Sequence, residues 1–165
     1  GLVMLGIFIM FLILFRNVKI SLIGVIPNFI AAFSILGLIG LLNIPLDMMT
    51  ITIAAITIGI AVDNSIHYIY RFIEEFKYKQ NYNEVIKICH SSVGVAILNT
   101  SITIVFGFSI LVLSNFIPTI YFGIFTGIAM LLAMLLVLSL LPALITLIKP
   151  FGIEIHDWKL SKFFK

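Results

Sequence analysis

The chain has 165 residues and a net charge of +3, and 62% of its residues are hydrophobic while only 10% are charged. A soluble globular domain has roughly 45–50% apolar and about 25% charged residues, so this composition excludes a water-soluble enzyme and a disordered regulator. The single cysteine, Cys89, excludes a disulfide-rich secreted scaffold. We therefore predict an all-α integral membrane protein, a five-helix transmembrane bundle.

Five continuous apolar stretches carry this prediction, since about 20 apolar residues in helical form cross a bilayer. Their expected bounds are 1–15, 20–42, 48–70, 93–113 and 119–148. The first stretch is short for a span, and the chain starts inside it without a methionine, so we expect a fragment of a larger protein. The fifth exceeds the bilayer thickness and is expected to tilt or to extend into the interface.

The basic residues predict the orientation of these spans. If the connections alternate between the two sides, all ten fall on one side: Arg16, Lys19, Arg71, Lys77, Lys79, Lys87, Lys149, Lys159, Lys162 and Lys165. The opposite connections, residues 43–47 and 114–118, contain none. Because basic loops face the cytoplasm, we expect a multi-pass protein of the cell membrane with its basic loops and its C-terminus inside.

Two polar segments lie on the predicted cytoplasmic side. Residues 71–92 form a connector in which residues 82–89 have apolar positions at helical spacing. This pattern fits a short amphipathic helix on the membrane surface, and a plain solvated connector is the alternative. Residues 149–165 form a basic, aromatic tail that either contacts anionic headgroups or is a frayed terminus.

Asp63 is the most informative residue, because an aspartate at the centre of a membrane-spanning helix costs about 2.5–3.5 kcal/mol on insertion scales. Residues 51–62 before it are apolar except for threonine and glycine, which places Asp63 inside the membrane, toward the cytoplasmic end. Such a residue usually faces the bundle interior or a water-filled path, where a carboxyl group can carry protons. The alternative is a structural residue that is hydrogen-bonded across the bundle.

Gly59 and His67 lie one helical turn to either side of Asp63 and share its helix face. Gly59 leaves room for a neighbouring helix to approach. His67 can pass protons to Asp63, because imidazole titrates near neutral pH, or it is an interfacial histidine without a special role. Asn64 supplies hydrogen-bond donor and acceptor groups on the adjacent face.

A second polar cluster lies in the fourth predicted span. It contains Asn99, Thr100 and Thr103, with Gly107 one turn beyond Thr103. In the alternating topology Asn99 reaches a depth similar to that of Asp63. These side chains are predicted to hydrogen-bond across helices and to provide Asp63 with partners or water. The alternative is that the hydroxyl groups bond back to their own helix.

The segment Gly59-Ile-Ala-Val-Asp63-Asn-Ser-Ile-His67-Tyr-Ile-Tyr-Arg71-Phe-Ile-Glu-Glu75 resembles the fourth-span signature of the resistance–nodulation–division (RND) superfamily. The likeness is closest to the MMPL-type and Patched-like exporters. Supporting matches are Arg16-Asn-Val-Lys19 before a span that contains Pro27, Asn99-Thr-Ser-Ile-Thr103, and Leu140-Leu-Pro142-Ala143. The resemblance covers about residues 1–150, and its specific part is the Asp63 segment.

This resemblance implies a transporter driven by the proton-motive force, with twelve spans in two similar halves. Each half has one span, a large extracytoplasmic domain and five further spans. The chain would form the last five spans of one half, and its basic tail favours the C-terminal half. The proton-relay acid of the family maps onto Asp63. Many members carry a second acid at the next position, where this chain has Asn64, so the chain departs from a two-carboxylate relay.

The predicted function is therefore the membrane part of a proton-driven exporter of hydrophobic or amphiphilic molecules, including lipids. Two alternatives stay open: a lipid-binding module similar to a sterol-sensing domain, without transport, and a translocation auxiliary similar to SecD/SecF. An enzyme is not expected, because one acid and one histidine make no nucleophile–base–orienter set. No metal or cofactor is expected. The expected partners are membrane lipids, the substrate and the rest of the polypeptide, and not nucleic acid.

Overall fold

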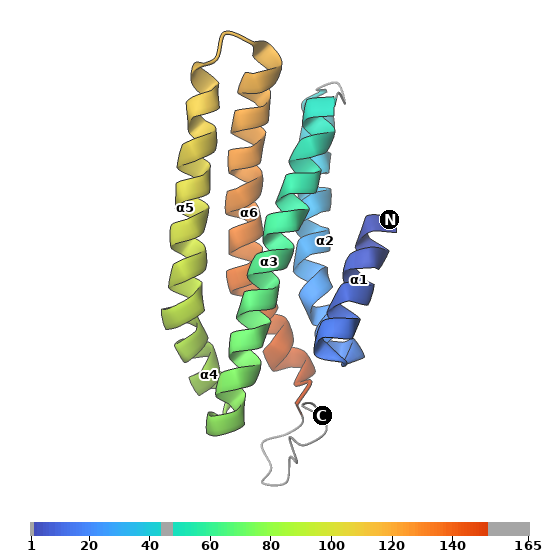
Figure 1. Cartoon of the computed structure of the whole chain (residues 1–165), viewed down its shortest axis with the longest axis vertical. Helices are drawn as coiled ribbons and strands as arrows, with labels where there is room; N and C mark the ends of the chain where they lie inside the picture. Colours follow the sequence, from blue (N-terminus) through green and yellow to red (C-terminus); the bar gives the residue numbers. More distant parts are fainter. Residues whose placement is uncertain (1, 44–47, 152–165) are drawn as a thin grey trace.

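The computed structural model describes residues 2–43 and 48–151, and this part of the chain folds into helices joined by short turns, without a strand (Figure 1). The elements in chain order are α1 (Leu2–Phe15), α2 (Val18–Leu41), α3 (Met48–Lys79), α4 (Tyr82–Cys89), the π-helical turn η1 (His90–Gly94), α5 (Val95–Ser109), the 3₁₀ turn η2 (Ile110–Leu113) and α6 (Ile117–Ile148). The predicted all-α bundle is confirmed.

Four helical stretches in the described residues are long and apolar enough to cross a membrane. They are residues 18–41, 51–79, 82–113 and 117–148, and the third joins α4, η1, α5 and η2. The apolar helix α1 has 14 residues and is shorter. Large apolar side chains also cover the outside of the bundle, among them Ile13, Phe106 and Leu135, each at least 60% exposed. A bundle that is apolar outside as well as inside is suited to lipid.

Two tight turns at one end of the bundle have the same construction. Arg16 and Gln80 follow α1 and α3 and adopt the left-handed conformation, with φ of 48° and 52°, which commonly ends a helix. The next residues, Asn17 and Asn81, are the N-cap residues directly before α2 and α4. Their side-chain oxygens accept hydrogen bonds from backbone amides in the first turn, such as Lys19 N at 2.9 Å, as a helix N-cap does.

The third helix is longer than the apolar stretch predicts. The expected span ended at residue 70, whereas α3 continues to Lys79. Ion pairs on the helix surface support the added turns, because Arg71 contacts Glu74 at 3.2 Å and Glu75 at 2.7 Å, three and four residues along. Residues 82–89 form the separate helix α4, which buries Tyr82, Val85 and Cys89. Of the predicted tail, residues 152–165 lie outside the described residues.

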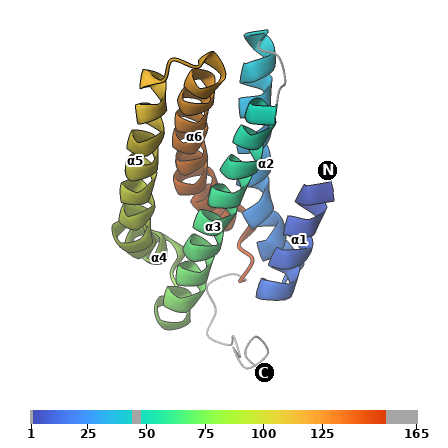
Figure 2. The same ribbon diagram turned by 45° about the horizontal axis from the view of Figure 1, so that its top comes forward.

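Helix α6 is the common packing partner of α2, α3 and α5, while α1 packs on α2 (Figures 1 and 2). Gly123 permits the tightest approach: a Cβ atom there would lie 2.7 Å from the Phe108 carbonyl oxygen and 2.9 Å from Leu111 Cβ. At Gly127 the nearest such atom, on Val105, is 3.8 Å away. Small residues therefore let α5 and η2 lie directly against α6.

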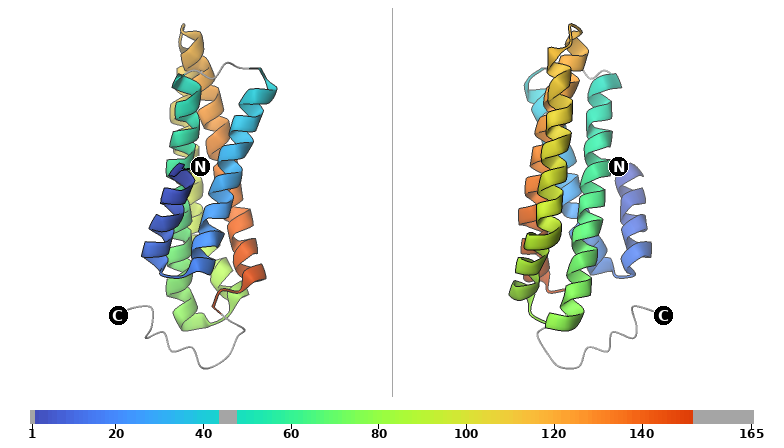
Figure 3. Two further views of the ribbon diagram at one scale, coloured as in Figure 1. Left: turned by 90° about the vertical axis from the view of Figure 1, so that its right-hand side faces the viewer. Right: turned by 60° about the vertical axis from the view of Figure 1, so that its left-hand side comes forward.

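The turns that carry basic residues all lie at one end of the bundle (Figure 3). This end holds the α1–α2 turn, the α3–α4 turn and the last residues of α6, and the turns at residues 42–43 and 114–116 lie at the other end. Every described lysine and arginine belongs to these end regions: Arg16, Lys19, Arg71, Lys77, Lys79, Lys87 and Lys149. The helix order therefore separates a basic end from an uncharged one.

Gly123→Ala is expected to destabilise the bundle, because the added methyl group meets the backbone of the α5–η2 segment, which cannot rotate away. Overpacking of this kind costs about 1–3 kcal/mol. Gly37→Ala in α2 is the matched control, since no atom of the described residues lies within 4 Å of the added Cβ. Thermal unfolding in detergent measures both variants, and an equal midpoint for the two would contradict the close contact.

Candidate functional site

Asp63 lies near the middle of α3, about 22 Å from its first residue along the helix axis. Ala61, Ser65 and Tyr68, on the opposite side of the helix, are completely buried in the bundle. The side chain of Asp63 is instead 68% exposed. Within the described residues the carboxyl group thus faces out of the bundle, on a helix face that carries no packed neighbour at Gly59, where a Cβ atom would meet nothing within 4 Å.

His67 is the nearest charged or titratable partner that the structure gives Asp63. Its Nε2 atom lies 3.5 Å from Asp63 Oδ1, and its side chain is also 68% exposed. The two residues are one turn apart, so helix geometry alone brings them together. Arg71, one turn further along, is engaged by Glu74 and Glu75. The spacing argument for Asp63 and His67 is therefore matched by a direct contact.

A pocket of about 320 Å³ opens beside this pair, between α3 and the beginning of α5. Its lining residues are Asp63, Asn64 and His67 from α3, Val93 from η1, and Ala96, Ile97 and Thr100 from α5. The pocket exists because α5 packs on α6 and leaves the Asp63 face of α3 free. The pocket lining thus combines an aspartate, a histidine, an asparagine and a threonine.

The predicted residues of the fourth span divide into two groups. Thr100 lines the pocket, whereas Asn99, Thr103 and Gly107 are exposed elsewhere on α5. The Thr100 hydroxyl donates to the Ala96 carbonyl and the Thr103 hydroxyl to the Asn99 carbonyl, each at 2.9 Å. Both threonines therefore bond back to their own helix, the alternative that the sequence left open, and Thr100 is also among the residues that line the pocket.

A polar contact inside the bundle escaped the sequence analysis. The completely buried Asn28 of α2 donates from Nδ2 to the Gly24 carbonyl at 2.8 Å, and its side-chain amide lies 3.3 Å from the hydroxyl of Ser65 on α3. Ser65 is two residues from Asp63, so this contact fixes α3 on the side opposite the pocket. Its signal in the sequence was an asparagine in the middle of an apolar span.

A second polar contact joins three helices beside the pocket and was also missed. His90, in η1, has Nε2 3.0 Å from the Leu138 carbonyl oxygen of α6, and its Nδ1 lies 3.2 Å from the Tyr68 hydroxyl group of α3. Tyr68 directly follows the pocket residue His67 in the sequence, and the pocket residue Val93 lies three residues after His90. The contact therefore adjoins both walls of the pocket.

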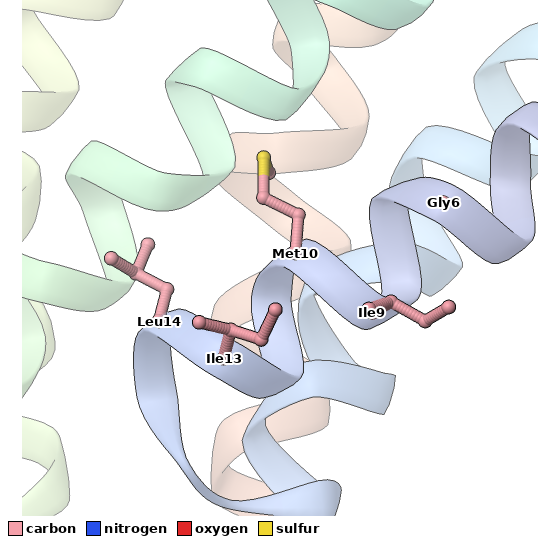
Figure 4. A pocket seen from close by; sticks show the side chains of 5 residues that line it. All are labelled: Gly6, Ile9, Met10, Ile13 and Leu14. Carbon is pink, nitrogen blue, oxygen red and sulfur yellow. The ribbon is translucent and has the colours of Figure 1, made fainter.

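Two other hollows on the surface of the described residues are apolar. One follows α1 alone and is lined by Gly6, Ile9, Met10, Ile13 and Leu14 (Figure 4). Another, toward the uncharged end, is lined by Met48 and Thr52 of α3 and by Leu111, Thr119 and Phe122. Neither has a charged lining residue, so the pocket beside Asp63 is the better candidate for proton chemistry.

A bundle of helices long and apolar enough to cross a membrane, with a carboxylate near the middle of one of them, defines the class of polytopic helical membrane proteins. Comparison with known proteins gives the family: residues 2–162 match the MMPL family. The chain is also 34% identical over 144 residues to the membrane protein MJ1562 of Methanocaldococcus jannaschii. This match covers 87% of the chain and 37% of the relative.

The chain therefore belongs to the MMPL family, as the resemblance of the Asp63 segment predicted. It spans a little more than a third of the length of the curated relative it matches. No solved structure matches the chain.

Ser65→Ala is expected to loosen α2 from α3, because it leaves the buried Asn28 amide without its interhelical contact. Interhelical polar contacts in membranes contribute about 0.6–2 kcal/mol, and we expect a loss in this range. Ser109→Ala is the control, since that hydroxyl is exposed and bonds within α5, to the Val105 carbonyl. Unfolding in denaturing detergent compares the two variants, and equal stabilities would contradict the role of the Asn28–Ser65 contact.

Proposed function

We propose that the chain is the membrane part of a proton-driven MMPL-type transporter that exports a hydrophobic or amphiphilic molecule, such as a lipid, and that Asp63 carries the proton. The observation that carries the proposal is the place of Asp63: a carboxyl group in mid-helix, 3.5 Å from His67 and beside a pocket with further polar groups. Intramembrane acids of this kind commonly mark proton and substrate paths. Membership of the MMPL family supports the transporter class.

The proton step needs only the residues that line the pocket. A hydrated proton that reaches the pocket can protonate the Asp63 carboxylate and leave a water molecule behind. The loss of the carboxylate charge makes the α3 face compatible with an apolar environment. His67 lies one turn nearer the basic end and can deliver or accept the proton on that side. Asn64 and Thr100 can hold water by hydrogen bonds. A single carboxylate is the carrier, because Asn64 occupies the place of a second acid.

The exposure of Asp63 supports a further part of the proposal, namely that another segment covers this face of α3. An aspartate turned toward lipid would cost about 2.5–3.5 kcal/mol. The rest of the parent polypeptide is the proposed cover, including a second transmembrane half, since the relative is much longer than the matched region. Extracytoplasmic domains of the parent would then select the substrate, and membrane lipids would surround the remaining apolar faces.

Asp63→Asn is expected to abolish proton flux, because an amide cannot take up and release a proton at physiological pH. The measurement uses the natural polypeptide that carries this chain, in proteoliposomes with an imposed pH gradient and candidate lipids as substrates. Glu84→Gln is the matched control: it removes a carboxylate from α4, outside the pocket, and should leave the flux unchanged. His67→Gln should lower the flux severalfold without abolishing it.

The outcomes separate the candidate functions. Equal insertion and folding of the variants must be established first. Flux in Asp63→Asn equal to that of the wild type would leave Asp63 a structural residue and refute the carrier role. No flux in any of the proteins, with all lipids tested, would favour a lipid-binding module without transport.

The same proposal places the basic end of the bundle in the cytoplasm of a cell-membrane protein, by the rule that basic loops stay inside. A single cysteine at residue 83, in a background with Cys89→Ala, should resist a membrane-impermeant maleimide in intact cells. A cysteine at residue 115, at the uncharged end, should react. The reverse pattern would invert the proposed orientation.

A further inference from the structure

His90 contacts groups from three helices. One of these groups is a backbone carbonyl that a proline leaves without its helical hydrogen-bond donor. Pro142 lies inside α6 and has no amide hydrogen, so it cannot donate the helical hydrogen bond to the carbonyl four residues before it. That carbonyl belongs to Leu138. The Nε2 atom of His90 lies 3.0 Å from the Leu138 oxygen, and the imidazole N–H thus occupies the place of the missing proline N–H.

The Leu138 carbonyl decides which role Nε2 plays in this contact. A carbonyl oxygen can only accept, so Nε2 must carry the hydrogen in the contact with Leu138. The Nδ1 atom lies 3.2 Å from the Tyr68 hydroxyl and 3.0 Å from the Ile86 carbonyl. The Ile86 carbonyl already accepts the backbone N–H of His90. His90 thus contacts Tyr68 of α3 through Nδ1 and Leu138 of α6 through Nε2, and so joins α3 to α6.

The His90–Leu138 contact affects the pocket because of where His90 lies in the chain. His90 begins the π-helical turn η1, which leads directly into α5. Because each residue of an α-helix advances the direction by about 100°, the extra residue of a π turn rotates every later side chain relative to α4. The turn thus decides that Ala96 and Thr100 face the pocket. Isolated π turns occur frequently at functional sites.

We propose that His90 is a positioning residue for the proton site: its Nε2–H bond to the carbonyl that Pro142 leaves without a donor holds the first turns of α5 beside Asp63. This inference rests on the proposed function for its effect on proton flux. Its geometric part is independent, since it concerns only the separation of α3 and α5. The contact also explains why a helix-bending proline is tolerated in α6, where lipid offers no donor for a freed carbonyl.

Three substitutions separate the hydrogen bond from the bulk of the ring. His90→Phe keeps a ring and removes both nitrogens. His90→Gln keeps an amide N–H at the same number of bonds from the backbone as Nε2. Pro142→Ala restores the N–H that can donate to Leu138 within α6, so in this background the His90 bond should no longer be needed.

The experiment measures two quantities on the natural polypeptide. One is the α3–α5 distance, from spin labels introduced by Tyr78→Cys at the basic end of α3 and Leu98→Cys on α5, both exposed positions, with Cys89 and any other cysteine of the polypeptide replaced by alanine. The other is proton flux in proteoliposomes. His90→Phe should widen the distance distribution and lower the flux severalfold, because the Leu138 carbonyl loses its donor and α5 is no longer held beside Asp63. His90→Gln should retain most of both. In the Pro142→Ala background, His90→Phe should have a much smaller effect.

Each outcome decides the proposal. Equal damage from His90→Phe and His90→Gln, or the same effect of His90→Phe with and without Pro142, would overturn it. If His90→Phe does not fold, the double variant with Pro142→Ala should fold, and failure of both would also overturn it. An absence of flux in the wild type refutes the proposed transport, while the spin-label distances still test the position of α5.

Discussion

Helix α6 determines where the other long helices lie, because α2, α3 and α5 all pack against it. In a bilayer the lipid is as apolar as the side chains, so helices associate through close van der Waals packing and polar contacts rather than through the hydrophobic effect. The contact at Gly123, where a side chain would collide with the Phe108 carbonyl oxygen, is the clearest example. Since α5 is bound to α6 in this way, it leaves one face of α3 uncovered.

The backbone imposes a second constraint of the same origin. Every N–H and C=O group in hydrocarbon needs a partner within the protein, and a proline inside a helix breaks this balance. The bundle restores it at Pro142 with a side chain from another helix, His90. The buried Asn28 follows the same rule, because its amide donates to the Gly24 carbonyl while contacting Ser65. Polar side chains in the bundle interior thus serve both helix packing and backbone satisfaction.

The proposed chemistry uses the face of α3 that these contacts leave free. Asn28 and His90 contact Ser65 and Tyr68 of α3 from the bundle side. Asp63 and His67 project from the other side of the same segment. A rigidly held helix can thus present a carboxyl group to water and to a covering segment of the parent protein. The polar residues that line the pocket distinguish this face of α3 from the hollow along α1, whose lining is apolar.

The sequence by itself determined the membrane class, the helical bundle, the basic end and the family, because long apolar runs, charge placement and the Asp63 segment depend on local order along the chain. It also gave the Asp63–His67 contact, since residues four apart on a helix are neighbours. It did not give the extension of α3 to Lys79, which depends on ion pairs and aromatic packing beyond the apolar stretch. Nor did it predict which threonine of the fourth predicted span would line the pocket beside Asp63.

Only the tertiary structure decided that Asp63 faces outward and that Thr100 lines its pocket while Asn99 and Thr103 do not. The reason is that the rotation of α5 depends on the π turn at His90–Gly94, which hydropathy does not record. The pairing of His90 with the Leu138 carbonyl likewise joins positions 48 residues apart. Such contacts arise from the distances between packed helices, and a single sequence carries no direct measure of those distances.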